Sequence, residues 1–268
     1  MSASLTGARA WRRPPLIRNP WLRWTLYLGA LIYLTAALAT VEVNWQRVAE
    51  GLSQGWRFVE GFLVPDFFSR SRDIWRGMEE SITMTVTSTI AGCLISVPIG
   101  LGAARNIAPL PVYALCRAII TVSRSFQEII VAILFVAMFG FGPFAGFLTL
   151  TFGTIGFMAK LLAEDIEDID EAQAEAVRAT GASWWQVINY GIQPQITPRL
   201  IGLSLYRLDI NFRESAVIGI VGAGGIGATL NTAMQRYEYS TAGAILIMII
   251  VVVLLAEYVS SYLRKWVQ

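Results

Sequence analysis

Long apolar segments, each about as long as a membrane span, constrain this chain more than any other feature. They occupy residues 24–40, 81–104, 109–139, 144–162, 196–221 and 242–263. A helix needs about 20 predominantly apolar residues to cross the hydrocarbon core of a bilayer. Within lipid, only helices and closed barrels satisfy their own backbone hydrogen bonds. The segments therefore predict an all-α membrane protein with about six transmembrane helices.

The composition agrees with this class and argues against several others. Of the 268 residues, 55% are hydrophobic and 15% are charged, and the net charge of +2 is too small to indicate a nucleic-acid partner. The chain has no histidine, the side chain used most often as a general base and as a metal ligand. Cys93 and Cys116 lie in apolar runs without CxxC spacing, so we expect buried free thiols. We expect no catalytic residue and no metal site.

Basic residues near the ends of the apolar segments predict the orientation of the chain. Five arginines and no acid precede residue 24, Arg105 follows the second segment, and Arg264-Lys265 follow the last. Because cytoplasmic loops are enriched in Lys and Arg, both termini are expected in the cytoplasm. Residues 41–80 mix acids, arginines and aromatics, which is typical of an interfacial segment. The chain thus divides into 1–80, with basic tail, first helix and extracytoplasmic interfacial segment, and 81–268, the transmembrane domain.

The third apolar segment is interrupted by polar residues from Ser123 to Glu128, including Arg124. A charge at membrane depth is costly unless it faces protein or a water-filled cavity. The interruption is therefore either an element that lines a solute path or a short turn before a re-entrant helix. Both interpretations stay open, as does the question of whether 109–139 is one broken span or two segments.

A polar stretch at 164–198 separates two spans and is patterned like folded protein. Small and apolar residues recur there at steps of three and four, which predicts one helical face formed by Ile166, Ile169, Ala172, Ala176 and Ala179. Gly181 is expected to end this helix, and Ser183 with Gln186 forms a capping box for a second one. That second helix is expected to stop at Gly191 and Pro194. The pattern indicates a two-helix loop suited to binding another protein.

Within this loop, Glu175-Ala176, Gly181 and Pro194 resemble the "EAA" signature of the membrane subunits of ABC importers, E-A-A, three residues, G, nine residues, I-x-L-P. Val177, Gly191 and Gln193 depart from its third, Ile and Leu positions. In that family the loop forms coupling helices that dock into a groove on a cytoplasmic ATPase. The resemblance implies ATPase-coupling roles for Glu171, Glu175, Ala176, Gly181, Trp184, Trp185 and Pro194. An ordinary amphipathic loop between helices is the alternative.

The fifth apolar segment carries an unusual set of polar residues: Arg207, Asp209, Asn211, Arg213 and Glu214. Ionisable groups at membrane depth pair with one another or line a cavity. A guanidinium fork suits phosphonate or phosphate oxygens, so Arg213, with Arg207 or Arg124, is expected to make a translocation path attractive to an anion. The alternative is internal pairing, because Arg213 and Asp209 have i, i+4 spacing.

Gly222, Gly224 and Gly227 match G-x-G-x-x-G, but a dinucleotide site also needs a preceding strand inside a soluble sheet. With Gly225, they are instead expected to let the backbone turn sharply and pack closely. The run VIGIVGAGGIG, preceded by DINFRES, is similar to phosphonate-type permeases.

The resemblance, over residues 81–263, implies a type I ABC importer permease core in the bacterial cytoplasmic (inner) membrane that imports phosphonate or a related phosphorus oxyanion. It implies a dimer with a second copy or a paralogue, cytoplasmic ABC ATPase subunits and an extracytoplasmic substrate-binding protein. The chain has no G-x-x-x-x-G-K-[ST] motif, so ATP and Mg are expected in the ATPase and no cofactor in this chain. The alternatives are a permease for phosphate, phosphite or methionine, a membrane-embedded enzyme, or a passive channel.

Overall fold

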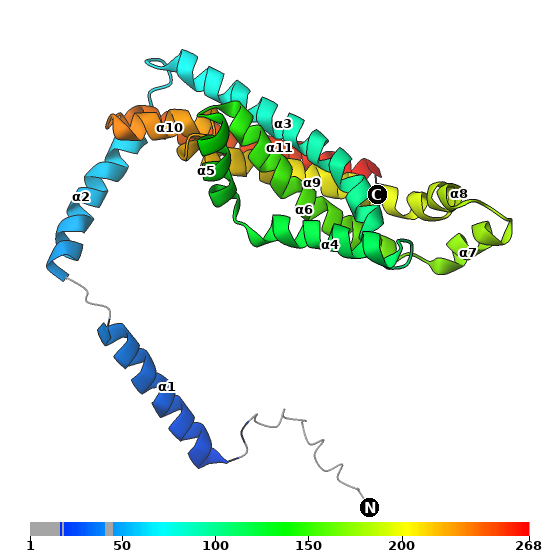
Figure 1. The fold of residues 1–268 in the computed structure, drawn as a ribbon. Helices are drawn as coiled ribbons and strands as arrows, with labels where there is room; N and C mark the ends of the chain where they lie inside the picture. Colours follow the sequence, from blue (N-terminus) through cyan, green and yellow to red (C-terminus); the bar gives the residue numbers. More distant parts are fainter. Residues whose placement is uncertain (1–16, 18, 41–44, 268) are drawn as a thin grey trace, which may run out of the picture. The chain divides into compact units, whose positions relative to one another are not determined.

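The computed structural model describes residue 17, residues 19–40 and residues 45–267, and this part of the chain contains helices and turns but no strand (Figure 1). It forms two compact units, Met1–Trp56 and Arg57–Gln268. Within the described ranges, five helices are long and apolar enough to cross a membrane, or six if one sharply bent pair counts as a span. The predicted all-α membrane fold is confirmed.

The first unit contains α1 (Pro20–Thr40) and the start of α2 (Trp45–Leu63). None of the α1 side chains is buried, and apolar residues cover the helix on all sides. A helix that is apolar all round is typical of a membrane span. Apart from Arg23, the arginines predicted to form a basic N-terminal tail lie outside the described residues.

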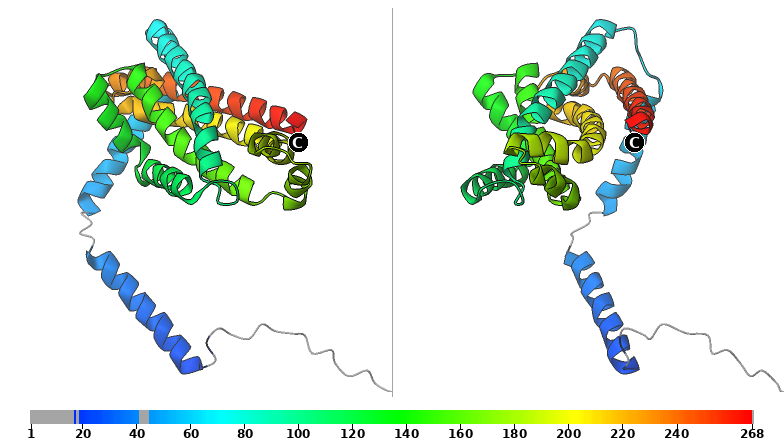
Figure 2. Two further views of the ribbon diagram at one scale, coloured as in Figure 1. Left: turned by 45° about the vertical axis from the view of Figure 1, so that its right-hand side comes forward. Right: turned by 90° about the vertical axis from the view of Figure 1, so that its right-hand side faces the viewer.

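The second unit is built around α3 (Ser71–Gly102) and α6 (Pro143–Glu167), which pack along most of their length. Close packing depends on small residues, as is usual between membrane helices. A methyl group on Gly92 would lie 2.5 Å from the Thr154 side chain, so glycine is required at this crossing. Next to this pair, α9 (Gln193–Ile220) and α11 (Tyr239–Val267) run side by side (Figure 2).

The interrupted third segment forms two helices, α4 (Leu110–Ser125) and α5 (Glu128–Phe139), which meet at 92°. Phe126 and Gln127 are extended, with ψ of 136° and 140°, so the first helix ends and the second starts in a new direction. Both helices pack on α6.

The polar stretch does not form the single helix that we predicted through residues 166–179. Instead α6 runs to Glu167, and α7 (Glu171–Ala179) starts after a break at 168–170. The side chain of Asp170 causes the new start, because it caps α7 by accepting a hydrogen bond from the Ala172 backbone N at 3.1 Å. As a result Ile166 is buried with α6, whereas the predicted alanine stripe of α7 is exposed and Ala174 is buried in its place.

The second helix of the loop also differs from the prediction in where it ends. It starts as expected at α8 (Trp184–Gln186) with the Ser183–Gln186 capping box, and Gly181 has the expected positive φ of 80°. It does not stop at Gly191 and Pro194 but continues through a π turn, η1 (Val187–Ile192), into α9. Pro194 lies in the first turn of α9, directly after the π turn. We call the end of the unit with α7 and α8 the loop end.

The glycine-rich run turns the chain from α9 into α10 (Gly225–Gln235), a helix that lies between the predicted apolar segments 196–221 and 242–263 and was not predicted. Gly222, Gly224 and Gly225 have positive φ, and a methyl group on Gly227 would lie 1.9 Å from the Ala216 carbonyl oxygen. These glycines therefore permit both the turn and the close contact between the two helices.

Candidate functional site

A cavity of about 450 Å³ lies at the break between α4 and α5. Its walls come from the ends of these two helices, the middle of α6 and the second half of α9. Four charged residues line it: Arg124, Glu128, Arg207 and Glu214. The cavity thus carries two positive and two negative groups in the apolar part of the molecule.

Two close contacts with α6 fix the end of α4 at this break. The Ser123 hydroxyl donates a hydrogen bond to the Phe152 carbonyl oxygen at 2.8 Å. A methyl group on Gly156 would lie 2.4 Å from the Ser123 hydroxyl oxygen, so a glycine is needed at this contact. Glu128 then starts α5, and a carboxylate is favoured in the first turn of a helix.

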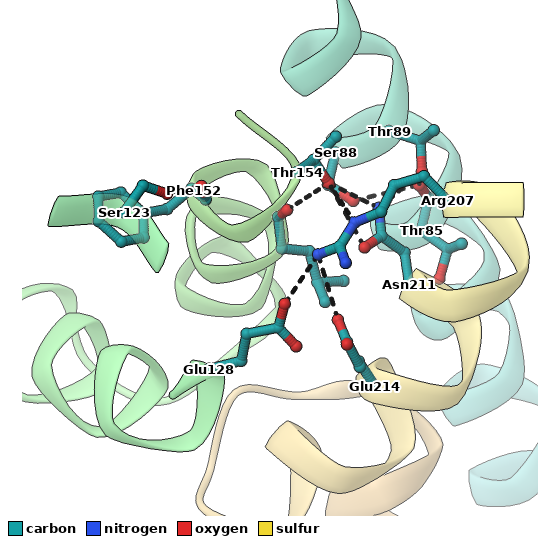
Figure 3. A network of polar contacts seen from close by, with 11 residues as sticks. Thr85, Ser88, Thr89, Ser123, Glu128, Phe152, Thr154, Arg207, Asn211 and Glu214 are labelled. Carbon is teal, nitrogen blue, oxygen red and sulfur yellow. Dashed lines mark hydrogen bonds and ion pairs between the residues drawn. The ribbon is translucent and has the colours of Figure 1, made fainter. Parts of the chain in front are cut away.

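Arg207 is at the centre of the polar network drawn in Figure 3, and its side chain is only 4% exposed. Its Nη2 lies 2.8 Å from Oε1 of Glu128 and 3.3 Å from Oε2 of Glu214. Its Nε donates to the Thr154 hydroxyl at 3.2 Å, and its guanidinium lies 5.4 Å from the centre of the Phe157 ring. A buried charge needs such compensation, because its transfer out of water is costly.

Gly153 on α6 leaves the room that the ion pair occupies. A methyl group there would lie 2.5 Å from Oε1 of Glu128 and 2.9 Å from Nη2 of Arg207. The position of this glycine therefore fits the ion pair as well as the helix packing.

A layer of neutral polar groups lies next to Arg207, between α3, α6 and α9. The fully buried Asn211 amide donates to the Thr89 hydroxyl at 2.8 Å and to the Thr154 hydroxyl at 2.9 Å. Thr154 thus contacts both the arginine and the asparagine. Hydrogen bonds of this kind fix the rotation of packed helices relative to one another.

Asp209 and Arg213 form a separate ion pair on α9, with 2.7 Å between Oδ2 and Nη2. The Asp209 side chain is 11% exposed and its Oδ1 has no hydrogen-bond partner in the described part of the chain, whereas the Arg213 side chain is 54% exposed. Neither residue lines the cavity at the α4–α5 break.

The structure thus separates the residues that we predicted for a translocation path. It brings Arg124, Arg207 and Glu214 to one cavity and places Asn211 behind them. Sequence reasoning did not select Glu128, Gly153 and Thr154. Glu128 had a sequence signal, because it ends the polar interruption of the third segment, whereas nothing in the sequence links Gly153 to Arg207.

The residues with predicted coupling roles gather at the loop end. All seven are exposed: Glu171, Glu175, Ala176, Gly181, Trp184, Trp185 and Pro194. The two tryptophans are 48% and 65% exposed, and their rings lie 4.7 Å apart. Glu167 ties this region to α4, because its Oε1 accepts from Nη2 of Arg117 and from the Arg105 backbone N, both at 2.8 Å. Among the described residues, no cluster of His, Cys, Asp or Glu could hold a metal ion.

Spanning helices, a charged cavity at a helix break and a folded loop with exposed tryptophans fit the membrane subunit of a transporter. The family model for the "binding-protein-dependent transport system inner membrane component" matches residues 96–268. The chain belongs to this family and is an inner-membrane permease of an ABC importer.

Two relatives illustrate the similarity. The phosphite transport system permease protein PtxC of Stutzerimonas stutzeri is 39% identical over 259 residues, which are 95% of this chain and 94% of that protein. The phosphate-import permease protein PhnE of Mycolicibacterium smegmatis is 41% identical over 202 residues, which are 75% of this chain but only 38% of that protein.

Among solved structures, the MetNI methionine ABC transporter in an inward-facing conformation matches with a TM-score of 0.61 and 26% identity. The match covers 74% of this chain and 95% of the MetNI chain. The fold is therefore that of type I ABC importer permeases.

Proposed function

We propose that this permease forms the path for import of a small phosphorus oxyanion, namely phosphonate, phosphite or phosphate. The observation that carries the proposal is the match to a phosphite permease over nearly the full length of both chains. The charged cavity supports it, because the guanidinium fork of Arg207 has the geometry and charge to bind oxygens of this kind.

The energy for import comes from a separate ATPase that docks on the loop end. Exposed Trp184 and Trp185 offer apolar surface for this contact, and the exposed acids of α7, Glu171 and Glu175, add negative charge at the loop end. ATP and Mg are bound by that partner, and this chain binds no cofactor. A folded loop fits this role because it transmits a movement that a flexible one would absorb.

The permease works as a dimer and receives its substrate from a binding protein on the outer side, with both chain termini in the cytoplasm. The Asp209–Arg213 pair supports the dimer, since an arginine that is 54% exposed on a spanning helix calls for protein or water beside it. The partner is either a second copy or a paralogue.

Uptake by cells tests the substrate class. A bacterial strain without its own phosphorus-oxyanion uptake is given this chain, its ATPase and its binding protein, and accumulation of labelled phosphite, methylphosphonate and phosphate is measured. We expect accumulation of at least one of the three that excess unlabelled methionine does not reduce. Accumulation of none of the three, or accumulation that methionine suppresses, would contradict the proposal.

A further inference from the structure

In the cavity at the α4–α5 break, Arg207 is already paired with carboxylates of the protein itself. Two carboxylates, from Glu128 and Glu214, both bind Nη2 of Arg207, at 2.8 and 3.3 Å (Figure 3). Nη1 has no hydrogen-bond partner among the described residues, although Arg207 lines the cavity. The arginine therefore has donors to offer, but its charge is already balanced by the protein itself.

The two carboxylates differ in how they are attached. Glu214 lies on α9, the same helix as Arg207, so the two move together. Glu128 is the first residue of α5 and reaches Arg207 across the cavity from beyond the 92° break. A movement of α5 away from α9 would therefore draw Glu128 away from Arg207 and leave the Glu214 contact in place.

We propose that Glu128 is an internal counter-ion that occupies the oxyanion position on Arg207, and that the transported oxyanion displaces it. This inference rests on the proposed function. A substrate oxyanion takes the place of the Glu128 carboxylate on Nη2 and adds a second hydrogen bond from Nη1. Without substrate, the Glu128–Arg207 pair closes the path to other anions, because it leaves the cavity no net positive charge.

Gly153 supports this assignment, because a side chain at this position would enter the space that the exchanging groups occupy. A methyl group there would lie 2.5 Å from the Glu128 carboxylate and 2.9 Å from Arg207 Nη2. Thr154 and the Phe157 ring hold the other parts of the guanidinium in place while one of its partners is exchanged.

Direct binding of small oxyanions to the permease tests the exchange. The permease–ATPase complex, in nanodiscs and without binding protein, is dialysed against labelled methylphosphonate or phosphate. Glu128→Gln removes the competing charge and is expected to tighten binding about tenfold, whereas Arg207→Gln abolishes it. Glu79→Gln is the control, because Glu79 is exposed on α3 and does not line this cavity.

Each outcome decides the proposal. If the wild type binds too weakly to measure, measurable binding by Glu128→Gln supports it, and equal or weaker binding by that variant overturns it. If Glu128→Gln does not assemble with the ATPase, Glu128→Ala, which also removes the charge, is used as the test variant instead. If cells take up a phosphorus oxyanion but neither Glu128 variant tightens binding, the inference fails and the proposed function stands.

Discussion

Arg207 carries a positive charge into the middle of a helical membrane protein, and its neighbours explain how the fold tolerates it. Two carboxylates, one hydroxyl and one aromatic ring surround a side chain that is 4% exposed. Removal of one partner from such a cluster leaves an uncompensated charge, which is far costlier than replacement of the whole cluster. Single substitutions here are therefore informative only with matched controls.

Gly153→Ala is predicted to destabilise the protein, because the new methyl group would overlap the Glu128–Arg207 ion pair. Overpacking of this kind costs about 1–3 kcal/mol. The expected result is a lower thermal unfolding temperature in detergent, measured by tryptophan fluorescence. Gly29→Ala is the control, since no atom lies within 4 Å of the added methyl position and alanine favours a helix. Equal unfolding temperatures for the two variants would contradict the close fit at Gly153.

From the sequence, Arg213 could either attract an anion to the path or pair internally with Asp209. Its 2.7 Å contact with Asp209 leads to a prediction that separates these two roles. If the pair acts as a unit, Arg213→Ala and Asp209→Ala reduce oxyanion uptake equally, and the double variant is no worse than either. A coupling energy of about 1 kcal/mol is expected in a double-mutant cycle of stability. Loss of uptake in the arginine variant alone would instead assign Arg213 to the anion path.

For single helices, the sequence predicts caps and turns that depend on neighbouring residues better than it predicts where a helix is interrupted. The Ser183–Gln186 capping box and the turn at Gly181 depend on residues close in sequence, and both form as predicted. The break at 168–170 was missed because the periodic apolar pattern continues across it, while the Asp170 cap competes with the helix. Likewise α10 was missed, because this helix of 11 residues is too short for a span and lies outside the long apolar segments, and its close packing on α9 depends on glycines.

Gly181 connects α7 to α8 with a φ of 80°, which leads to a prediction for the coupling loop. A β-branched residue in this conformation costs about 1–2 kcal/mol, whereas asparagine adopts it more readily. Gly181→Val is therefore expected to reduce the amount of ATPase that co-purifies with the permease, and Gly181→Asn to retain most of it. Equal co-purification for both variants would mean that the loop conformation does not matter for docking.

At the scale of the whole molecule, the lengths of the apolar segments predict the class, but not the site. Glu128 and Arg207 are 79 positions apart, and only the packing of α5 and α9 around α6 brings them together. Periodicity describes which face of one helix is apolar and contains no information on which faces of distant helices meet. The signatures in the loop and in the glycine run indicated the family, but they did not indicate that Glu128 and Arg207 meet.

The proposed topology predicts which ends of the helices a membrane-impermeant maleimide can reach in intact cells. Ser183→Cys, at the loop end, is expected to label only after the membrane is opened. Phe141→Cys, in the exposed turn between α5 and α6, is expected to label from outside. Wild-type protein is the control for Cys93, which is half-buried, and Cys116, which is buried. The reverse labelling pattern would contradict cytoplasmic termini.

ATP-driven uptake into proteoliposomes shows whether this permease imports a phosphorus oxyanion at the expense of ATP. The permease is reconstituted with its ATPase, ATP is enclosed with the ATPase side inside, and labelled phosphite, methylphosphonate or phosphate is added outside with the binding protein. We predict accumulation of one of these oxyanions above its external concentration, abolished when ATP is replaced by a non-hydrolysable analogue. Equilibration without ATP, or accumulation of none of the three, would contradict the account of this chain as an ATP-powered oxyanion permease.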